Sequence, residues 1–203
     1  RIGLPEEEMK VKYPKTYGYL KKFEVTLRQR AAYKRYFSND SPFYSIFDVG
    51  EYTFSPWKVV WQGMGFKMQA CVVGKVKNKS VLTNQAMHPF ISLHNEKEAH
   101  YICALLNSSP FDYAVQSHTE KGGKSFAQSN ILKHFRIPKF NPKDSVHCKL
   151  SELSQQAHKA ATKGDDTEVK KIEEKIDHYA AKLWNLTDKE LKDIQISLKE
   201  LSE

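Results

Sequence analysis

The chain lacks the features that mark a secreted, membrane-spanning or zinc-binding protein. Its three cysteines, Cys71, Cys103 and Cys148, form no CxxC pair, and no Cys/His spacing fits a zinc site. An odd number of cysteines without a framework is typical of a reducing compartment. No apolar run approaches the ~20 residues that cross a bilayer, and the N-terminus has no signal-peptide core. We expect a cytoplasmic protein with no membrane partner, and the missing initiator Met indicates a piece of a longer polypeptide.

Motifs of common catalytic sites are also missing. The chain contains no GxGxxG, Walker, HExxH or GxSxG pattern, and the run at 120–125 lacks the first glycine of a phosphate loop. Asp144 with Glu173 and Lys175 loosely resembles a nuclease pattern, but Glu173 falls in the middle of a predicted helix. We therefore predict no catalytic residue, no metal and no cofactor in this chain, with a cryptic nuclease domain as an alternative.

Positive charge is what the chain has in excess, and it is unevenly distributed. Residues 53–143 hold twelve Lys or Arg against four Asp or Glu, so their net charge of +8 equals that of the whole chain. Residues 1–52 carry +3 and residues 144–203 carry −3. A basic block favours a polyanionic partner. We divide the chain into a basic domain, 1–143, and a helical C-terminal extension, 144–203.

The hydrophobic pattern predicts an α+β fold. Residues 13–37 show helical periodicity with Pro14 in the first turn, so we expect a long N-terminal helix. That helix would lie on a twisted mixed β-sheet formed by residues 43–93, with short inserted helices. Asn95 caps one helix, a short one starts near Pro110, and the C-terminal extension is α-helical, with a capping box at 187–190.

The segment 42–62 is rich in aromatic residues and has one lysine. We expect strands over 43–54 and 57–62, with most of the aromatic rings in the sheet core. Lys58 and one of Trp57 or Trp61 are the candidates to face a ligand.

Lysine and amide side chains on the predicted strands and loops are typical of a surface that reads duplex DNA. Lysines contribute affinity through phosphates, whereas Gln and Asn can pair with adenine in the major groove. Gln62 or Gln128 is the predicted base reader, and Lys121 and Lys124 lie in a glycine loop that would touch the phosphate backbone. The candidate DNA-binding residues are Arg28, Lys34, Arg35, Lys58, Trp61, Gln62, Lys67, Lys75, Lys77, Lys79, Lys121, Lys124 and Gln128.

Five ordered sequence blocks resemble the C-terminal part of N6-adenine DNA methyltransferases from restriction–modification systems. Among them, the blocks are most similar to those of single-chain type II enzymes, in which one polypeptide carries both the methylation and the specificity functions. The blocks are YPKTYGYLKKFEVTLRQR, PFYSIFDVGEYTFSPWKVVW, EAHYICALLNSSP, RIPKFNPKDSVHCKLSELSQQAHK and IDHYAAKLWNLTDKELKDI.

This resemblance implies that residues 1–143 are a target recognition domain, which binds double-stranded DNA and follows the catalytic domain. The catalytic domain of such enzymes carries the S-adenosylmethionine motif and an (Asn/Asp)-Pro-Pro-(Tyr/Phe) loop, and neither is present here. We expect the cofactor in the catalytic methyltransferase domain of the same polypeptide, and an adenine-specific parent enzyme that could also cleave DNA. The alternative is a protein-interaction or helical scaffold module.

Overall fold

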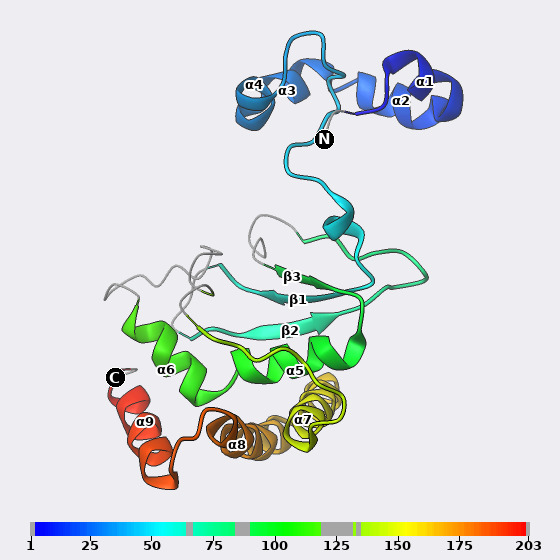
Figure 1. Cartoon of the computed structure of the whole chain (residues 1–203). Coiled ribbons are helices and arrows are strands. Elements are labelled where there is room, and N and C mark those ends of the chain that lie inside the picture. Colours follow the sequence, from blue (N-terminus) through cyan, green and yellow to red (C-terminus); the bar gives the residue numbers. More distant parts are fainter. Residues whose placement is uncertain (1–2, 64–66, 84–89, 119–131, 133–134, 202–203) are drawn as a thin grey trace. The chain divides into compact units, whose positions relative to one another are not determined.

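The computed structural model describes residues 3–63, 67–83, 90–118, 132 and 135–201. The chain divides into two compact units, Arg1–Thr53 and Phe54–Glu203, here the N-terminal and C-terminal units. The described residues form helices and a three-stranded antiparallel sheet, followed by C-terminal helices (Figure 1). The predicted α+β class with a helical C-terminal part is confirmed.

The N-terminal unit contains short helices where one long helix was predicted. Pro14 occupies the first turn of its helix, as expected. The prediction of a continuous helix over 13–37 is wrong, because the backbone leaves the helical region at Phe23 and again at Arg30, where ψ is 134°. The helices are α1 (Glu6–Lys12), α2 (Pro14–Lys21), α3 (Glu24–Gln29) and α4 (Ala31–Tyr36).

Arginine side chains explain why the aromatic segment after α4 is not a strand. Arg30 donates to the carbonyl oxygens of Phe43 and Ser45 at 3.0 and 2.8 Å, and Arg28 donates to that of Ser41 at 3.3 Å. Backbone carbonyls near the interior need donors, and here guanidinium groups supply them in place of a neighbouring strand. The strand predicted over 43–54 is therefore wrong: the segment is irregular and ends in a 3₁₀ turn, η1 (Glu51–Phe54).

The C-terminal unit begins with the sheet, whose strand order is β2-β1-β3. The strands are β1 (Trp57–Trp61), β2 (Ala70–Val73) and β3 (Phe90–Leu93). Val59 pairs with Val72 on one side and Ile91 on the other, and both pairings are antiparallel. The strand predicted over 57–62 is confirmed, and β2 and β3 lie within the predicted sheet region 43–93, but the described sheet is antiparallel and not mixed.

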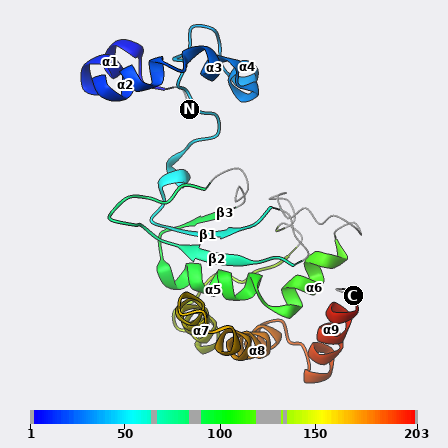
Figure 2. The ribbon, with the colours of Figure 1, turned by 180° about the vertical axis from the view of Figure 1, so that it is seen from behind.

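Helix α5 (Glu96–Leu106) lies between the sheet and two further helices (Figures 1 and 2). Ala99, Cys103 and Leu106 pack on the sheet with Val59 and Trp61. Its other side packs on α7 (Ser145–Thr162) and α8 (Asp166–Leu183) through residues of a second cluster, Tyr101, Ala104 and Leu105. The predicted cap is confirmed, since the Asn95 side chain accepts from the N–H groups of Lys97 and Glu98.

The last helices are joined through a buried carboxylate. Asp177 of α8 accepts from the N–H and Oγ of Ser109 in α6 (Ser109–Ser117) and from Gln195 in α9 (Asp188–Glu200). The predicted capping box of Thr187 and Glu190 is confirmed. Because α7 and α8 share a core with α5, residues 144–203 belong to the same compact unit as the sheet. The functional division at residue 143 stays a prediction.

None of the described helices is long and apolar enough to span a bilayer.

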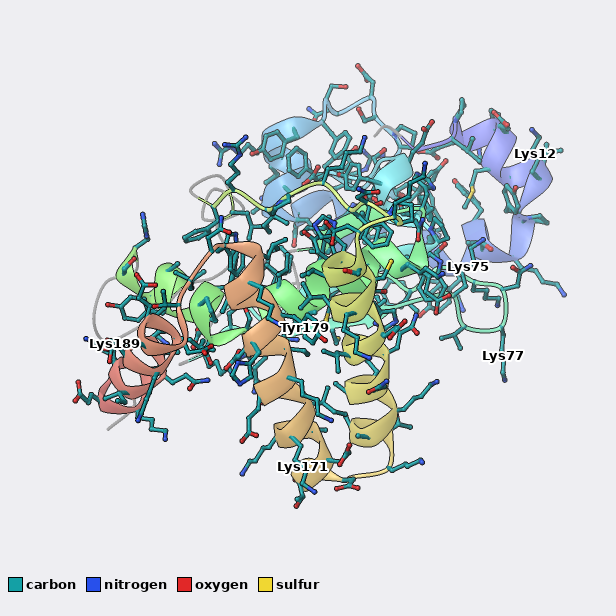
Figure 3. The ribbon with its side chains drawn as sticks, turned by 60° about the horizontal axis from the view of Figure 1, so that its bottom comes forward. Lys12, Lys75, Lys77, Lys171, Tyr179 and Lys189 are labelled. Atoms are coloured by element: carbon teal, nitrogen blue, oxygen red, sulfur yellow. The ribbon has the colours of Figure 1, made fainter. Side chains whose placement is uncertain are left out.

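Gly164 makes the turn between α7 and α8. Its φ is +72°, its N–H donates to Ala161 O, and the N–H of Asp165 donates to Ala160 O. These two bonds form a Schellman motif, which favours glycine at the left-handed position. The turn reverses the chain and sets α8 beside α7, as Figure 3 shows.

We predict that Gly164→Ala lowers the free energy of unfolding by about 1–2 kcal/mol, because alanine at positive φ brings Cβ against the following carbonyl. No atom lies within 4 Å of the added Cβ, so the cost comes from the backbone conformation alone. Lys163→Ala, at the preceding right-handed residue, is the control and should change stability by less than about 0.5 kcal/mol. Urea unfolding of both variants tests this, and equal losses would contradict it.

Candidate nucleic-acid interface

Strand β2 leads into a tight β-hairpin turn that carries three of the predicted lysines. Val76 and Lys79 exchange N–H···O bonds of 3.0 and 2.9 Å around a two-residue turn. The central residues, Lys77 and Asn78, have φ of 47° and 61°, as a type I′ turn requires. We call residues 75–79 the basic hairpin.

The side chains of the basic hairpin are open to solvent. Lys75, Lys77 and Lys79 are exposed, and Figure 3 shows Lys75 and Lys77 on the loop that extends beyond the sheet. The sequence has no acidic residue between 54 and 95, and within the described chain none of these lysines pairs with a carboxylate. The hairpin therefore presents a concentrated positive charge to any polyanion that reaches it.

The base of the basic hairpin rests on an aromatic ring. A Cβ added to Gly74 would lie 2.6 Å from Cζ3 of Trp57, so only glycine lets the strand cross the indole so closely. Trp57 is partly buried and packs against the sheet-side core. This contact holds the start of the hairpin against β1.

Two side chains occupy the outer edge of β2. The Asn107 amide accepts from the N–H of Ala70 and donates to the Ala70 carbonyl, both at 2.8 Å. These are the two backbone groups that a neighbouring strand would otherwise bond. His158 of α7 accepts from the N–H of Val72 at 2.9 Å. An edge strand normally offers these groups to another chain. Here these backbone groups of β2 form hydrogen bonds within the chain. The strand that leads into the basic hairpin is therefore fixed.

The hydrogen bonds of His158 determine its tautomer. Nδ1 lies 2.7 Å from Ser154 O and must donate, because a carbonyl only accepts, which leaves Nε2 unprotonated to receive Val72 N–H. His100 stands edge-on to this ring at 4.9 Å and shares a 3.0 Å hydrogen bond with Ser154 Oγ. Burial, and secondly the neighbouring His158, lower the pKa of His100 to about 4.

We predict that stability falls as the pH drops from 6.5 to about 4. In this interval the unfolded chain protonates His100 and the folded chain does not, so the contribution is complete above pH 6.5 and lost by about pH 4. The loss should be at most about 3 kcal/mol. Urea unfolding across this range should show a shallower dependence for His100→Gln. His94→Gln, at an exposed histidine, should retain the wild-type dependence.

Lys58 and Trp61 are in the interior, contrary to the prediction that they face DNA. Trp61 is 1% exposed and belongs to the core between the sheet and α5. Lys58 is 2% exposed, and its ammonium donates to the carbonyls of Ser55 and Val81 at 3.1 and 3.0 Å. Burial lowers the pKa of Lys58. Because side chains alternate along a strand, Lys58 lies on the face of the sheet opposite α5. On that face it meets the backbone at Val81.

We predict that Lys58→Met destabilises the C-terminal unit by about 1–3 kcal/mol, because two carbonyls lose their donor while the side-chain volume is kept. Lys58→Ala should cost more, about 2–5 kcal/mol, since it also leaves a cavity. In folded Lys58→Met, the salt dependence of DNA binding should match that of the wild type. A salt slope lower by about one unit would show that Lys58 contacts phosphate after all.

The other candidates are scattered over the two units. Gln62 is half-buried and donates to Lys67 O at 3.2 Å. Lys67 is exposed and lines a hollow of about 550 Å³ whose wall also contains Asp112 and Glu174, so its surroundings are not uniformly basic. Lys121, Lys124 and Gln128 lie outside the described residues.

In the N-terminal unit, Arg28 is engaged in structure. It pairs with Glu24 at 3.0 Å and donates to Tyr33 Oη at 2.9 Å, in addition to Ser41 O. Lys34 and Arg35 are exposed on α4.

The sequence did not reveal Asn107 and His158, the two residues that position β2. Asn107 contacts a residue 37 positions away and His158 one 86 positions away, and no local pattern links such distant positions.

The nuclease-like pattern is not assembled into a metal site in the described residues. Asp144 is the N-cap of α7 and accepts from the N–H groups of Val146 and His147. Glu173 and Lys175 lie in the middle of α8. No group of three or more His, Cys, Asp or Glu in the described chain could hold a metal ion.

Comparison with known proteins links the chain to a type II methyltransferase. It is 37% identical over 108 residues to a protein named type II methyltransferase M.NspV, from Nostoc sp. (strain ATCC 29411 / PCC 7524). The match covers 53% of this chain and 22% of that protein, so it spans about a fifth of the relative's length. No protein-family model matches the chain. The chain is thus a partial homologue of a type II methyltransferase, which supports a relationship with restriction–modification methyltransferases.

Proposed function

We propose that this chain is the DNA target recognition part of an adenine-N6 methyltransferase from a restriction–modification system. It docks on duplex DNA and selects the site, and a catalytic domain of the same polypeptide binds S-adenosylmethionine and methylates a flipped adenine. The chain by itself is non-catalytic.

The observation that carries this proposal is the basic hairpin. A type I′ turn on a fixed edge strand projects three lysines that pair with no carboxylate among the residues that the structure describes, and the sequence from 54 to 95 has no acidic residue. A two-stranded ribbon fits the DNA major groove, and lysines beside it can neutralise phosphates. Partial homology to a type II methyltransferase supplies independent support.

The C-terminal helices have a different part in the proposal. Residues 144–203 are net negative, and α9 with α6 borders an apolar hollow of about 360 Å³ whose lining includes Phe111, Tyr113, Trp184 and Ile194. An acidic surface repels DNA, whereas an apolar one can contact protein. These helices support the fold and contact another domain of the parent enzyme.

Replacing the three hairpin lysines with alanine should weaken binding to all duplex sequences. Each phosphate contact contributes about 0.9 to the slope of log K against log salt, so the slope should fall by up to about three units. The test is a titration of the 203-residue chain with labelled duplex at several salt concentrations. The matched control replaces Lys171, Lys175 and Lys189, exposed lysines of the C-terminal helices, and removes the same charge. Equal effects of the two triple variants would contradict the proposed interface.

A further inference from the structure

A pair of stacked aromatic rings lies on the surface of the N-terminal unit. The rings of Tyr36 in α4 and Phe47 in the following loop are parallel within 11°, with centroids 3.7 Å apart. The two residues remain 47% and 44% exposed. Each ring covers one face of the other, so the exposed area lies outside the pair.

The stack is held in place before any ligand arrives. Arg30 is the N-cap of α4, and its guanidinium donates to Phe43 O and Ser45 O in the segment that leads to Phe47. One side chain thus fastens the helix that carries Tyr36 to the loop that carries Phe47. Because both elements are fixed, little ordering entropy is lost when a flat ligand stacks on the pair.

The helix that carries Tyr36 also carries two cations. The guanidinium of Arg35 lies 5.3 Å from the centroid of the Tyr36 ring, and Lys34 is exposed on the same short helix. Among the described residues, neither cation forms an ion pair with a carboxylate. A flat apolar surface with cations on the same helix matches a ligand that has a ring and a phosphate.

We propose that Tyr36, Phe47, Lys34 and Arg35 form a stacking platform for an unpaired nucleobase. In an intact duplex both faces of a base are covered, so the platform can act only on a base that has left the stack. Phe47, backed by Tyr36, supplies the ring surface, and Lys34 and Arg35 contact the flanking phosphates. The inference rests on the proposed DNA-binding function and adds to it a preference for distorted DNA.

The test compares two labelled duplexes with the same flanks, one fully paired and one with a single bulged adenine. The chain should bind the bulged duplex more tightly, and Phe47→Leu, which keeps an apolar side chain but removes the flat ring, should abolish the preference. One stacked base is worth roughly a fivefold to hundredfold difference in affinity. Phe47→Tyr retains the ring and should retain the preference.

The matched control is Phe23→Leu. Phe23 is also aromatic, 45% exposed and in the same unit, but it meets Tyr19 edge-on, at 5.3 Å and 60°. This variant should keep the preference for the bulged duplex. Circular dichroism checks that each variant is folded. If Phe47→Leu does not fold, the comparison rests on Phe47→Tyr.

The outcomes separate this inference from the proposed function. If the wild type binds the paired duplex in a salt-dependent manner without preferring the bulge, the platform is wrong and the DNA-binding function stands. If Phe47→Leu weakens binding to both duplexes equally, or Phe23→Leu loses the preference as Phe47→Leu does, the assignment to an unpaired base is likewise overturned. If the wild type binds neither duplex, both proposals fail.

Discussion

Helix α5 is the element on which the C-terminal unit depends. It is covered by the sheet on one side and by α7 and α8 on the other, so it must be apolar on both. Seven of its eleven residues are buried. A helix covered on two sides transmits the position of one layer to the next, because close-packed side chains leave no room for independent movement. The α7–α8 pair therefore fixes the orientation of the sheet that carries the basic hairpin.

Polar groups then set the details that packing leaves open. Asn107 at the end of α5 and His158 in α7 satisfy the outer edge of β2, which would otherwise be free to pair with another strand. One contact comes from the end of the covered helix α5 and the other from α7. These helices therefore support the hairpin and also close the edge of the sheet.

In the N-terminal unit, arginines have the role that a sheet was expected to have. Arg28 and Arg30 provide donors for the carbonyls of an irregular, aromatic-rich segment. The charges of Arg28 and Arg30 therefore stabilise the fold of the unit, whereas Lys34 and Arg35 remain exposed to solvent. The same segment brings Phe47 to Tyr36. A basic and aromatic composition is thus divided between residues that build the unit and residues that are available to a ligand.

The sequence by itself determined the α+β class, the C-terminal helices and their caps at Asn95 and Thr187, because these depend on local periodicity and on neighbouring residues. It also placed Lys75, Lys77 and Lys79 among the lysines of the predicted strands and loops of a basic segment. Only the tertiary structure decided that Lys58 is buried, that residues 13–37 form separate helices and that Asn107 and His158 hold β2. Each of these depends on a contact between distant positions. Lysine has the same charge in the core as on the surface, and only the burial of its neighbours distinguishes the two.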